Sequence, residues 1–404
     1  MDVLRCAYGC CRANKGAAGV DGQTFDDVET YGVERRLGEL AEELRTKQCK
    51  PGAVRRAYIP KPNGKMRPLG IPCLRDRVRQ TAAATVLEPV FEADLQPEQY
   101  ACRRRRGAKE AVVKVHELLS RGRREVVDAD LSGHFDAIPH LEQMKSAARR
   151  IVDKRMLRLI RMRLEEPVEE KGEDGRKIRT TTNRDAGKGA PQGAPISPLL
   201  SNLYMRRFIL GWKKFGSEGR FGAKIVNYAD DLVICCKGKA SQALAMMREI
   251  MSKLKLTVNE EKTRCCSMPK EKFDFLGYTF ARLCSVKRRK LYIGACPSQK
   301  SIKRMTEAIH AQTERSMGWM DAGEMVNQLN RKLKGWANYF QLGAVSKAYW
   351  LIDKCTTIRL RRWLCKKRKQ RGTGTRRCPD EFLYNKLGLI RLPKLPQSFP
   401  WAKA

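Results

Sequence analysis

The chain has 404 residues, enough for two or three domains, and it carries 82 Lys and Arg against 44 Asp and Glu. A soluble protein rarely keeps a net charge of +38 without a polyanionic partner, and nucleic acid is the first candidate. No apolar run approaches the roughly 18 residues of a spanning helix, and the N-terminus has no signal-peptide core, so we expect no membrane partner and a cytoplasmic protein. The 15 cysteines form no Cys-x-x-Cys spacing, which favours reduced thiols over zinc sites or disulfides.

The first elements are a helix and a basic hairpin. Residues 31–46 show the apolar period of a helix. Residues 55–72 predict two short strands around a Pro-Asn-Gly turn, and the cations on the two arms include Lys61 and Arg67. Such a hairpin can reach over a triphosphate or a nucleic-acid backbone, and a solvated basic hairpin is the alternative.

A run of four arginines follows a helix that we expect over residues 74–97. The run consists of Arg103, Arg104, Arg105 and Arg106. Because it contains no acidic residue, we interpret it as a surface that faces phosphate groups, with an ordinary solvated surface as the alternative.

Residues 125–131 predict a buried strand that ends near a glycine, where the backbone can turn. Asp128 and Asp130 lie two residues apart, so they share one face if the strand is regular. Residues 141–164 then predict a helix, and residues 173–176 carry a hairpin-turn signal.

A Gly/Pro-rich loop at residues 189–198 precedes a helix expected over residues 199–210. Backbone N–H groups at such a helix start can face an anion or a base.

Two apolar runs, residues 223–226 and 232–236, predict buried strands joined by the turn Tyr228-Ala229-Asp230-Asp231. Adjacent carboxylates on the rim of an apolar hairpin repel each other, so one pKa should rise unless a cation is supplied. A divalent metal is the usual cation, and hard oxygen ligands favour Mg²⁺. An ordinary Asp-rich solvated turn is the alternative.

The rest of the chain predicts a helix at residues 240–253, a strand at residues 273–278 and long helices beyond Pro297. Between residues 354 and 377, eleven of 24 residues are Lys or Arg and none is acidic. A helix with such a face suits a grooved polyanion. The cations that we expect to contact nucleic acid here are Arg361, Arg362, Lys366 and Lys367.

Together, these motifs resemble those of group II intron-encoded reverse transcriptases, also called maturases, and they stand in the same order. The motifs are Asn14-Lys15-Gly16, Val20-Asp21-Gly22, Ile59-Pro60-Lys61, Arg67-Pro68-Leu69-Gly70-Ile71-Pro72, Asp130-Leu131, Phe135-Asp136, Pro191-Gln192-Gly193, Ile196-Ser197-Pro198-Leu199-Leu200-Ser201-Asn202, Tyr228-Ala229-Asp230-Asp231, Asn259-Glu260-Glu261-Lys262-Thr263, Phe275-Leu276-Gly277-Tyr278 and Gly335-Trp336-Ala337-Asn338-Tyr339-Phe340.

The chain departs from the family at residues 100–106, where the family tends to have Tyr-Gly-Phe-Arg-Pro-Gly-Arg, and this puts the local conformation in doubt. The resemblance is to the form without a C-terminal endonuclease module. It implies an α+β right-hand polymerase fold. Fingers and palm, with an antiparallel sheet and helices, would occupy residues 1–290. A helical thumb, or maturase domain, would occupy residues 291–371, followed by a short tail at residues 372–404.

The resemblance also implies a site for nucleotidyl transfer with two Mg²⁺ ions, or Mn²⁺, held by Asp130, Asp230 and Asp231. From the residues alone, Asp128 and Asp136 compete with Asp130 for this role. The other implied contacts are Lys61 and Arg67 on the triphosphate, Gln192 and Tyr228 at the incoming nucleotide, Lys262 at the pyrophosphate and Phe135 as a gate against the ribose 2′-hydroxyl. A surface lysine is the alternative for Lys262, and a core aromatic is the alternative for Phe135.

The expected function is therefore an RNA-directed DNA polymerase that copies intron RNA and assists its splicing and mobility. Its expected partners are the intron RNA, an RNA template with a DNA primer, target DNA and dNTPs, whereas the oligomeric state stays open. A maturase with a decayed polymerase and an RNA-dependent RNA polymerase are the alternatives. Without an endonuclease module, we expect extension of a supplied 3′ end.

Overall fold

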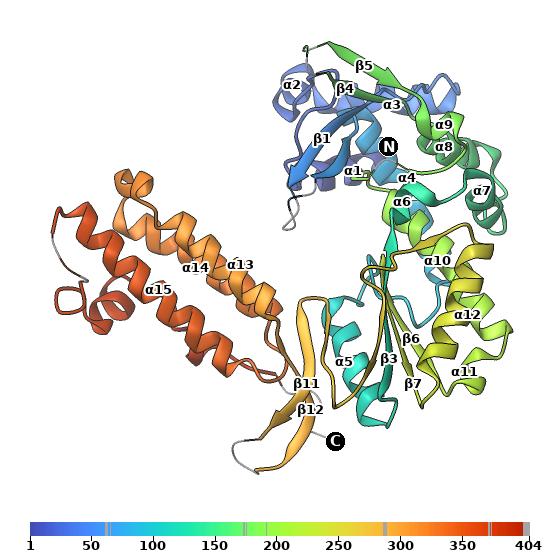
Figure 1. Ribbon diagram of the computed structural model, residues 1–404. Helices are drawn as coiled ribbons and strands as arrows, with labels where there is room; N and C mark the ends of the chain where they lie inside the picture. Colours follow the sequence, from blue (N-terminus) through green and yellow to red (C-terminus); the bar gives the residue numbers. More distant parts are fainter. Residues whose placement is uncertain are drawn as a thin grey trace.

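The computed structural model describes residues 1–60, 64, 66–172, 174, 176–190, 192–285, 289–370, 372 and 374–398. Its helices and mostly antiparallel sheets confirm the α+β class. Figure 1 shows the fingers at the top, the palm below them and a helical thumb to one side. Within the described residues, the longest and most apolar helices still fall short of what crossing a membrane requires.

The fingers are built on a sheet of strand order β2-β1-β4-β5. Its strands are β1 (Val54–Pro60), β2 (Met66–Ile71), β4 (Val168–Lys171) and β5 (Lys177–Thr180). The helices around it are α1 (Asp2–Ala13), α2 (Phe25–Tyr31), α3 (Val33–Arg45), α4 (Leu74–Glu92), α7 (His140–Ala148), α8 (Lys154–Leu164) and α9 (Thr182–Asp185). The pairings of β1 with β2 and of β4 with β5 confirm both predicted hairpins, whose turns lie partly outside the described residues.

The helix predicted over residues 141–164 is two helices, α7 and α8. The break occurs because Asp153 caps α8: its carboxylate accepts a hydrogen bond from the backbone N–H of Arg155 over 2.7 Å. An N-cap of this kind starts a new helix rather than continuing the previous one.

The palm sheet has the order β6-β7-β3, and β8 and β9 both pair with β3 along its other edge. Its strands are β3 (Glu125–Ser132), β6 (Lys224–Tyr228), β7 (Asp231–Cys236), β8 (Thr257–Val258) and β9 (Arg264–Ser267). Its helices are α5 (Ala108–Ser120), α6 (His134–Ala137), α10 (Ser197–Lys214), α11 (Ser217–Arg220) and α12 (Ala240–Lys253).

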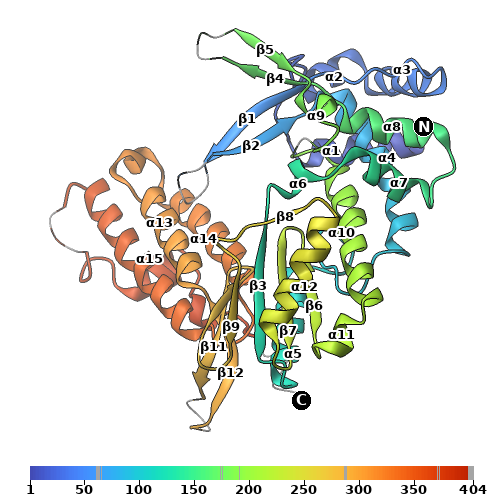
Figure 2. The same ribbon diagram turned by 45° about the vertical axis from the view of Figure 1, so that its right-hand side comes forward.

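The two faces of the palm sheet have different neighbours (Figure 2). Val127, Ala129 and Leu131 pack into a core with α10 and α12. Val126 packs into a second core with α5 and the strands that follow the palm. Because side chains alternate along a strand, Asp128 and Asp130 lie on the same face as Val126, as the spacing predicted.

The strand predicted over residues 273–278 is instead a tight hairpin. Strand β10 (Phe273–Phe275) ends at a two-residue turn, and β11 (Tyr278–Cys284) runs back and pairs with β12 (Leu291–Pro297). Leu276 and Gly277 form the turn with φ values of 49° and 78°. Positive φ at both positions is what a two-residue hairpin of this twist requires.

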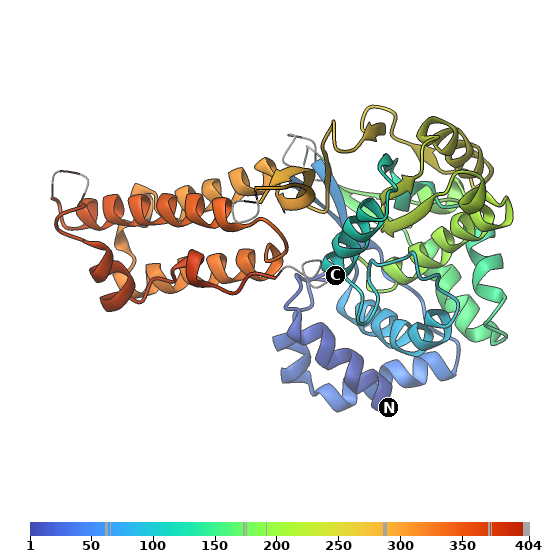
Figure 3. The same ribbon diagram turned by 90° about the horizontal axis from the view of Figure 1, so that it is seen from below.

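The thumb is an arm of long helices that extends from the palm (Figure 3). Its elements are α13 (Gln299–Gln312), η1 (Arg315–Trp319), α14 (Ala322–Tyr339), α15 (Ser346–Lys367), η2 (Phe382–Lys386) and η3 (Leu392–Lys394). Met325, Leu329 and Leu333 form an apolar stripe along α14 and are buried in the thumb core.

The predicted domain limits at residues 290/291 and 371/372 both cut through packed structure. β11 pairs with β12 across the first limit, so the helical part begins at Gln299. Beyond the second limit, Cys378, Leu383 and Leu392 are buried in the thumb core. The described part of the tail is therefore part of the thumb.

Candidate active site

Asp130 and Asp231 lie directly opposite each other in neighbouring strands. Asp130 is near the end of β3, Asp231 begins β7, and the two residues are partners in the antiparallel register. Opposite residues in such a pair place their side chains on the same face of the sheet. Leu131 also donates its backbone N–H to the carbonyl oxygen of Asp230 over 3.2 Å. The β3–β7 pairing therefore brings together the three predicted catalytic aspartates.

The turn between β6 and β7 consists of Ala229 and Asp230, because Tyr228 pairs with Asp231. Ala229 has a φ of 54°, in the left-handed region that favours glycine. The side chain of Asn227 is 1% exposed and supports this conformation. Its Nδ2 donates to the carbonyl oxygens of Ala229 over 2.9 Å and of Asp231 over 3.4 Å. The turn that carries Asp230 is thus stabilised by hydrogen bonds from the buried side chain of Asn227.

Nearby positive charge compensates the carboxylates on this face only in part. Burial, followed by the charges of Asp230 and Asp130, raises the pKa of Asp231 to about 7. Burial also raises the pKa of Asp128 to about 6, although Arg264 lies 3.5 Å from that carboxylate and opposes the shift. An added cation near Asp231 would favour its ionised form.

The side chain of Lys262 contacts Asp130. It is also exposed to solvent, as expected for the alternative of a surface lysine. Its Nζ donates to Oδ2 of Asp130 over 2.9 Å, and this hydrogen bond raises the pKa of Lys262. Asn259 donates from Nδ2 to the same oxygen over 3.1 Å, and its backbone N–H donates to the carbonyl oxygen of Asp130 over 2.9 Å. The segment after β8 therefore supplies two partners for one aspartate.

The donor set suits Mg²⁺ that is shared with a substrate. Within the described ranges, no group of three or more His, Cys, Asp or Glu side chains is arranged to hold a metal ion. Mg²⁺ in polymerase sites, however, is bound through one or two carboxylates together with substrate phosphates and waters. Asp130 and Asp231 can supply such carboxylates, and the contact with Lys262 shows that Oδ2 of Asp130 accepts a cation.

The Gly/Pro loop lies against α6, the short helix after β3. Ala190 donates its N–H to the carbonyl oxygen of Phe135 over 2.9 Å, and Nε2 of Gln192 donates to Oδ2 of Asp136 over 3.3 Å. Gly70 of β2 donates to the carbonyl oxygen of Gln192 over 2.6 Å. This loop therefore joins the fingers to the palm, and Asp136 lies on α6 rather than on the sheet face of Asp130.

The remaining residues predicted to contact the nucleotide lie in the palm and in the fingers. Phe135 is half-buried, with its ring 5.5 Å from the ring of His134 in an edge-on arrangement. Tyr228 is half-buried at the end of β6. Arg67 is exposed on β2, opposite Ile59. Lys61 lies outside the described residues.

The arginine run is mostly engaged within the protein, which corrects the prediction for Arg103. The Arg103 side chain is 5% exposed, pairs with Glu92 and donates to backbone carbonyls. Arg106 stacks on the Tyr100 ring at 5.6 Å. Arg104 and Arg105 are exposed, and Arg104 lies 3.3 Å from a carboxylate oxygen of Glu88.

On the thumb, the structure separates Arg361 from the other predicted cations. Arg361 is buried, forms an ion pair with Asp380 and donates from Nε to the carbonyl oxygen of Cys378 over 2.8 Å, so the prediction that it contacts nucleic acid is not supported. Arg362, Lys366 and Lys367 are exposed. Lys367 also donates to the carbonyl oxygen of Gly318 over 3.0 Å.

Two residues of the site, Asn227 and Asn259, are not evident as site residues from the sequence. Asn227 interrupts the apolar run just before the turn, and a buried amide must find hydrogen-bond partners. That interruption is the available signal. Asn259 stands inside a motif that carries the resemblance, but the sequence does not show that its side chain reaches Asp130.

Comparison with known proteins identifies both parts of the chain. Residues 59–280, more than half of its length, match the family described as reverse transcriptase (RNA-dependent DNA polymerase). Residues 302–379 match the maturase-specific domain of group II introns. These two matches fall on the palm with part of the fingers, and then on the thumb, in the predicted order.

Relatives that align over most of this chain agree with these matches. The protein YkfC of Escherichia coli is 33% identical over 328 aligned positions, covering 72% of this chain and 83% of the relative. The group II intron-encoded protein LtrA of Lactococcus lactis is 26% identical over 429 aligned positions, covering 85% of this chain and 69% of LtrA. Among solved structures, telomerase from Candida albicans aligns with a TM-score of 0.48 and 10% identity, over 86% of this chain and 67% of that chain. The two family matches and the relatives YkfC and LtrA show that the chain belongs to the group II intron-encoded reverse transcriptases.

Proposed function

We propose that this protein is an active RNA-directed DNA polymerase that copies a group II intron RNA and assists its splicing and mobility. The observation that carries the proposal is the direct pairing of Asp130 with Asp231, next to Asp230 in the turn. Carboxylates from separate segments meet there on one sheet face, which is what nucleotidyl transfer with two metal ions needs. The match to the maturase-specific domain supports an intron RNA as the partner.

In this proposal, Asp130, Asp230 and Asp231 hold two Mg²⁺ ions, for which Mn²⁺ can substitute. Metal ions held by these carboxylates would supply activation of the primer 3′-hydroxyl and stabilisation of the leaving oxygen. Lys262 neutralises Asp130 before substrate binds, and its ammonium group is then placed to give a proton to the departing pyrophosphate.

The nucleotide is positioned where fingers and palm meet. Lys61 and Arg67 clamp the triphosphate, where a planar guanidinium can bind two phosphate oxygens at once. Gln192 and Tyr228 contact the incoming dNTP, and Phe135 lies under its sugar. The hydrogen bonds that join the Gln192 loop to β2 and to α6 support this placement, because they fix the loop between both parts.

Incubating the purified protein with a primed RNA template and either dNTPs or NTPs tests the proposal. We expect incorporation of dNTPs that needs Mg²⁺ and that stops when a chelator is added. Asp130→Asn and Asp230→Asn should reduce synthesis by at least about 100-fold, as expected when a group needed in the transition state is removed. RNA affinity should change little, because it depends on cations elsewhere.

The alternatives give different results in the same assay. RNA binding without any DNA synthesis by the wild type would favour a maturase with a decayed polymerase. Preferential use of NTPs would favour an RNA polymerase. Residual synthesis within about tenfold of wild type in both Asn variants would show that these aspartates are not the catalytic groups.

A further inference from the structure

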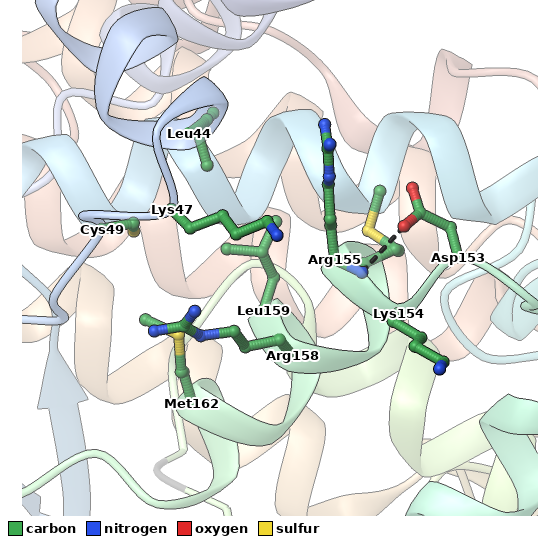
Figure 4. Close-up of a pocket in the computed structure, with 10 residues that line it drawn as sticks. Leu44, Lys47, Cys49, Asp153, Lys154, Arg155, Arg158, Leu159 and Met162 are labelled. Carbon is green, nitrogen blue, oxygen red and sulfur yellow. Dashed lines mark hydrogen bonds between the residues drawn. The ribbon is translucent and has the colours of Figure 1, made fainter.

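The fingers carry a cleft of about 360 Å³ that the polymerase site does not use (Figure 4). It lies between the end of α3 and the exposed side of α8. Its apolar lining includes Leu44, Leu159 and Met162. Figures 1 and 2 show α3 and α8 at the edge of the fingers that faces away from the thumb. A ligand in this cleft would therefore lie apart from the catalytic aspartates.

Cations surround this apolar floor. Lys47 and Arg158 extend across the cleft from opposite sides, and Arg155 stands at its rim (Figure 4). In the part of the chain that the structure describes, none of these three side chains is in an ion pair with a carboxylate. The carboxylate of Asp153, which also lines the cleft, caps α8 and so is already engaged.

The floor of the cleft is held in place from behind. Arg163, one turn along α8 from Leu159, is 2% exposed and forms an ion pair with Glu166, which is 4% exposed. Ile160 and Leu164 of the same helix are buried in a core with α4 and α10. A helix fixed in this way presents a preformed site, which lowers the entropic cost of binding.

An apolar floor under unpaired cations matches the chemistry of a single nucleotide. RNA is commonly recognised through unpaired bases that are splayed out and stacked on side chains, including the planes of arginine guanidinium groups. The phosphates on either side of such a base need cations at the rim. An acidic peptide would use the cations, but its carboxylates would leave the apolar floor without a partner.

We propose that this cleft binds one extruded, unpaired nucleotide of RNA. The base lies on Leu44, Leu159 and Met162, and the flanking phosphates contact Lys47, Arg155 and Arg158. The inference rests on the proposed function only in taking RNA as the partner, because it needs no polymerase chemistry. The cleft would thus recognise an unpaired nucleotide in the RNA, whereas the proposed catalytic site binds a template–primer pair.

The test compares two RNA hairpins that differ in one bulged nucleotide. We expect wild type to bind the bulged hairpin at least about fivefold more tightly than the fully paired one, a modest preference for one inserted base. Leu159→Asn keeps the net charge and makes the floor of the cleft polar, so the affinities for the two hairpins should become equal.

Arg155→Glu with Arg158→Glu tests the cations and should weaken binding of the bulged hairpin about tenfold or more. The log–log salt slope should fall by about 1.4–1.8, since each phosphate left without its cation accounts for about 0.7–0.9.

A matched control is Lys237→Glu with Lys272→Glu, which changes the net charge equally at two exposed palm lysines away from the cleft. It should leave the preference for the bulged hairpin intact. DNA synthesis on a primed homopolymer, together with thermal melting, reports whether each variant is folded. Where a charge reversal unfolds the protein, Arg155→Gln with Arg158→Gln replaces it.

Equal affinity of wild type for the two hairpins would overturn the inference. A weaker affinity in the charge variant without any effect of Leu159→Asn would overturn it as well, because the cleft would then be a phosphate-binding surface without a base site. Failure of the wild type to synthesise DNA would reject the proposed polymerase function and leave the hairpin comparison valid.

Discussion

The side-chain amide of Asn227 donates a hydrogen bond to the carbonyl oxygen of Ala229 over 2.9 Å, in the turn that carries Asp230. The backbone of the same residue is held from the other side. Its N–H donates to the carbonyl oxygen of Glu98 over 2.9 Å, and its carbonyl oxygen accepts from the N–H of Tyr100 over 3.0 Å. Asn227 therefore links the turn of the proposed active site to the segment before the arginine run.

The first prediction concerns this link. Asn227→Ala leaves the turn carbonyls without their donor, a change that costs about 1–3 kcal/mol. We expect the single-turnover rate of dNTP incorporation to fall about tenfold or more, while the apparent affinity for dNTP changes less than about twofold. Adding Ala229→Gly should restore part of the rate, because glycine adopts a φ of 54° without strain. A rate within about twofold of wild type in Asn227→Ala would show that the turn needs no such support.

The second prediction concerns the sugar of the incoming nucleotide. Phe135→Ala replaces a half-buried ring by a cavity, so NTPs should be incorporated at least about tenfold better relative to dNTPs. Competition between a dNTP and the matching NTP on one template measures the ratio. Unchanged selectivity together with a large fall in Tm would make Phe135 a core residue instead. Phe135→Tyr, which keeps the ring, serves as the control and should preserve selectivity.

Local patterns in the sequence are sufficient for most elements of the palm. The apolar runs on both sides of Tyr228-Ala229-Asp230-Asp231 are strands, and the Gly/Pro loop does precede a helix. Local patterns do not show which residue of β3 lies opposite Asp231. Register between strands from distant segments depends on packing across the whole sheet, so the residues alone leave Asp128, Asp130 and Asp136 open. The family resemblance selects Asp130, and the observed pairing places it opposite Asp231.

The errors have local physical causes. The pattern at residues 273–278 continues through Leu276, an unusual residue for a positive φ, so the sequence does not reveal the hairpin turn. The arginine predictions count charges without their partners. Glu92 pairs with Arg103 from eleven residues away, and Asp380 pairs with Arg361 from the segment predicted to be a tail. Composition cannot show such pairs, because the chain must fold before they form.

The third prediction concerns Lys262, whose ammonium group occupies Oδ2 of Asp130. Lys262→Ala removes this competitor, so the Mg²⁺ concentration that gives half-maximal synthesis should fall by about twofold or more. The maximal rate should also fall, by about 10²–10⁴-fold if the lysine acts as general acid. Titrating Mg²⁺ in steady-state assays separates the two effects. A variant that matches wild type in both quantities would leave Lys262 as a surface residue.

The last prediction separates two neighbouring arginines of α15. Arg362 and Lys366 are exposed, so Arg362→Gln with Lys366→Gln should weaken RNA binding and lower the log–log salt slope by about 0.7–0.9 for each phosphate that no longer meets a cation. Arg361→Gln is the matched change at a buried position. It removes the ion pair with Asp380 and a hydrogen bond to Cys378, so it should destabilise the thumb by about 1–3 kcal/mol and leave the salt slope unchanged. Filter binding over a range of salt concentrations, with thermal melting of each variant, measures both quantities.

If Arg361→Gln lowers the salt slope as much as the exposed pair does, the Arg361 side chain leaves Asp380 to contact RNA. If neither variant changes the slope, this face of α15 does not bind RNA, and the affinity must come from cations elsewhere on the chain.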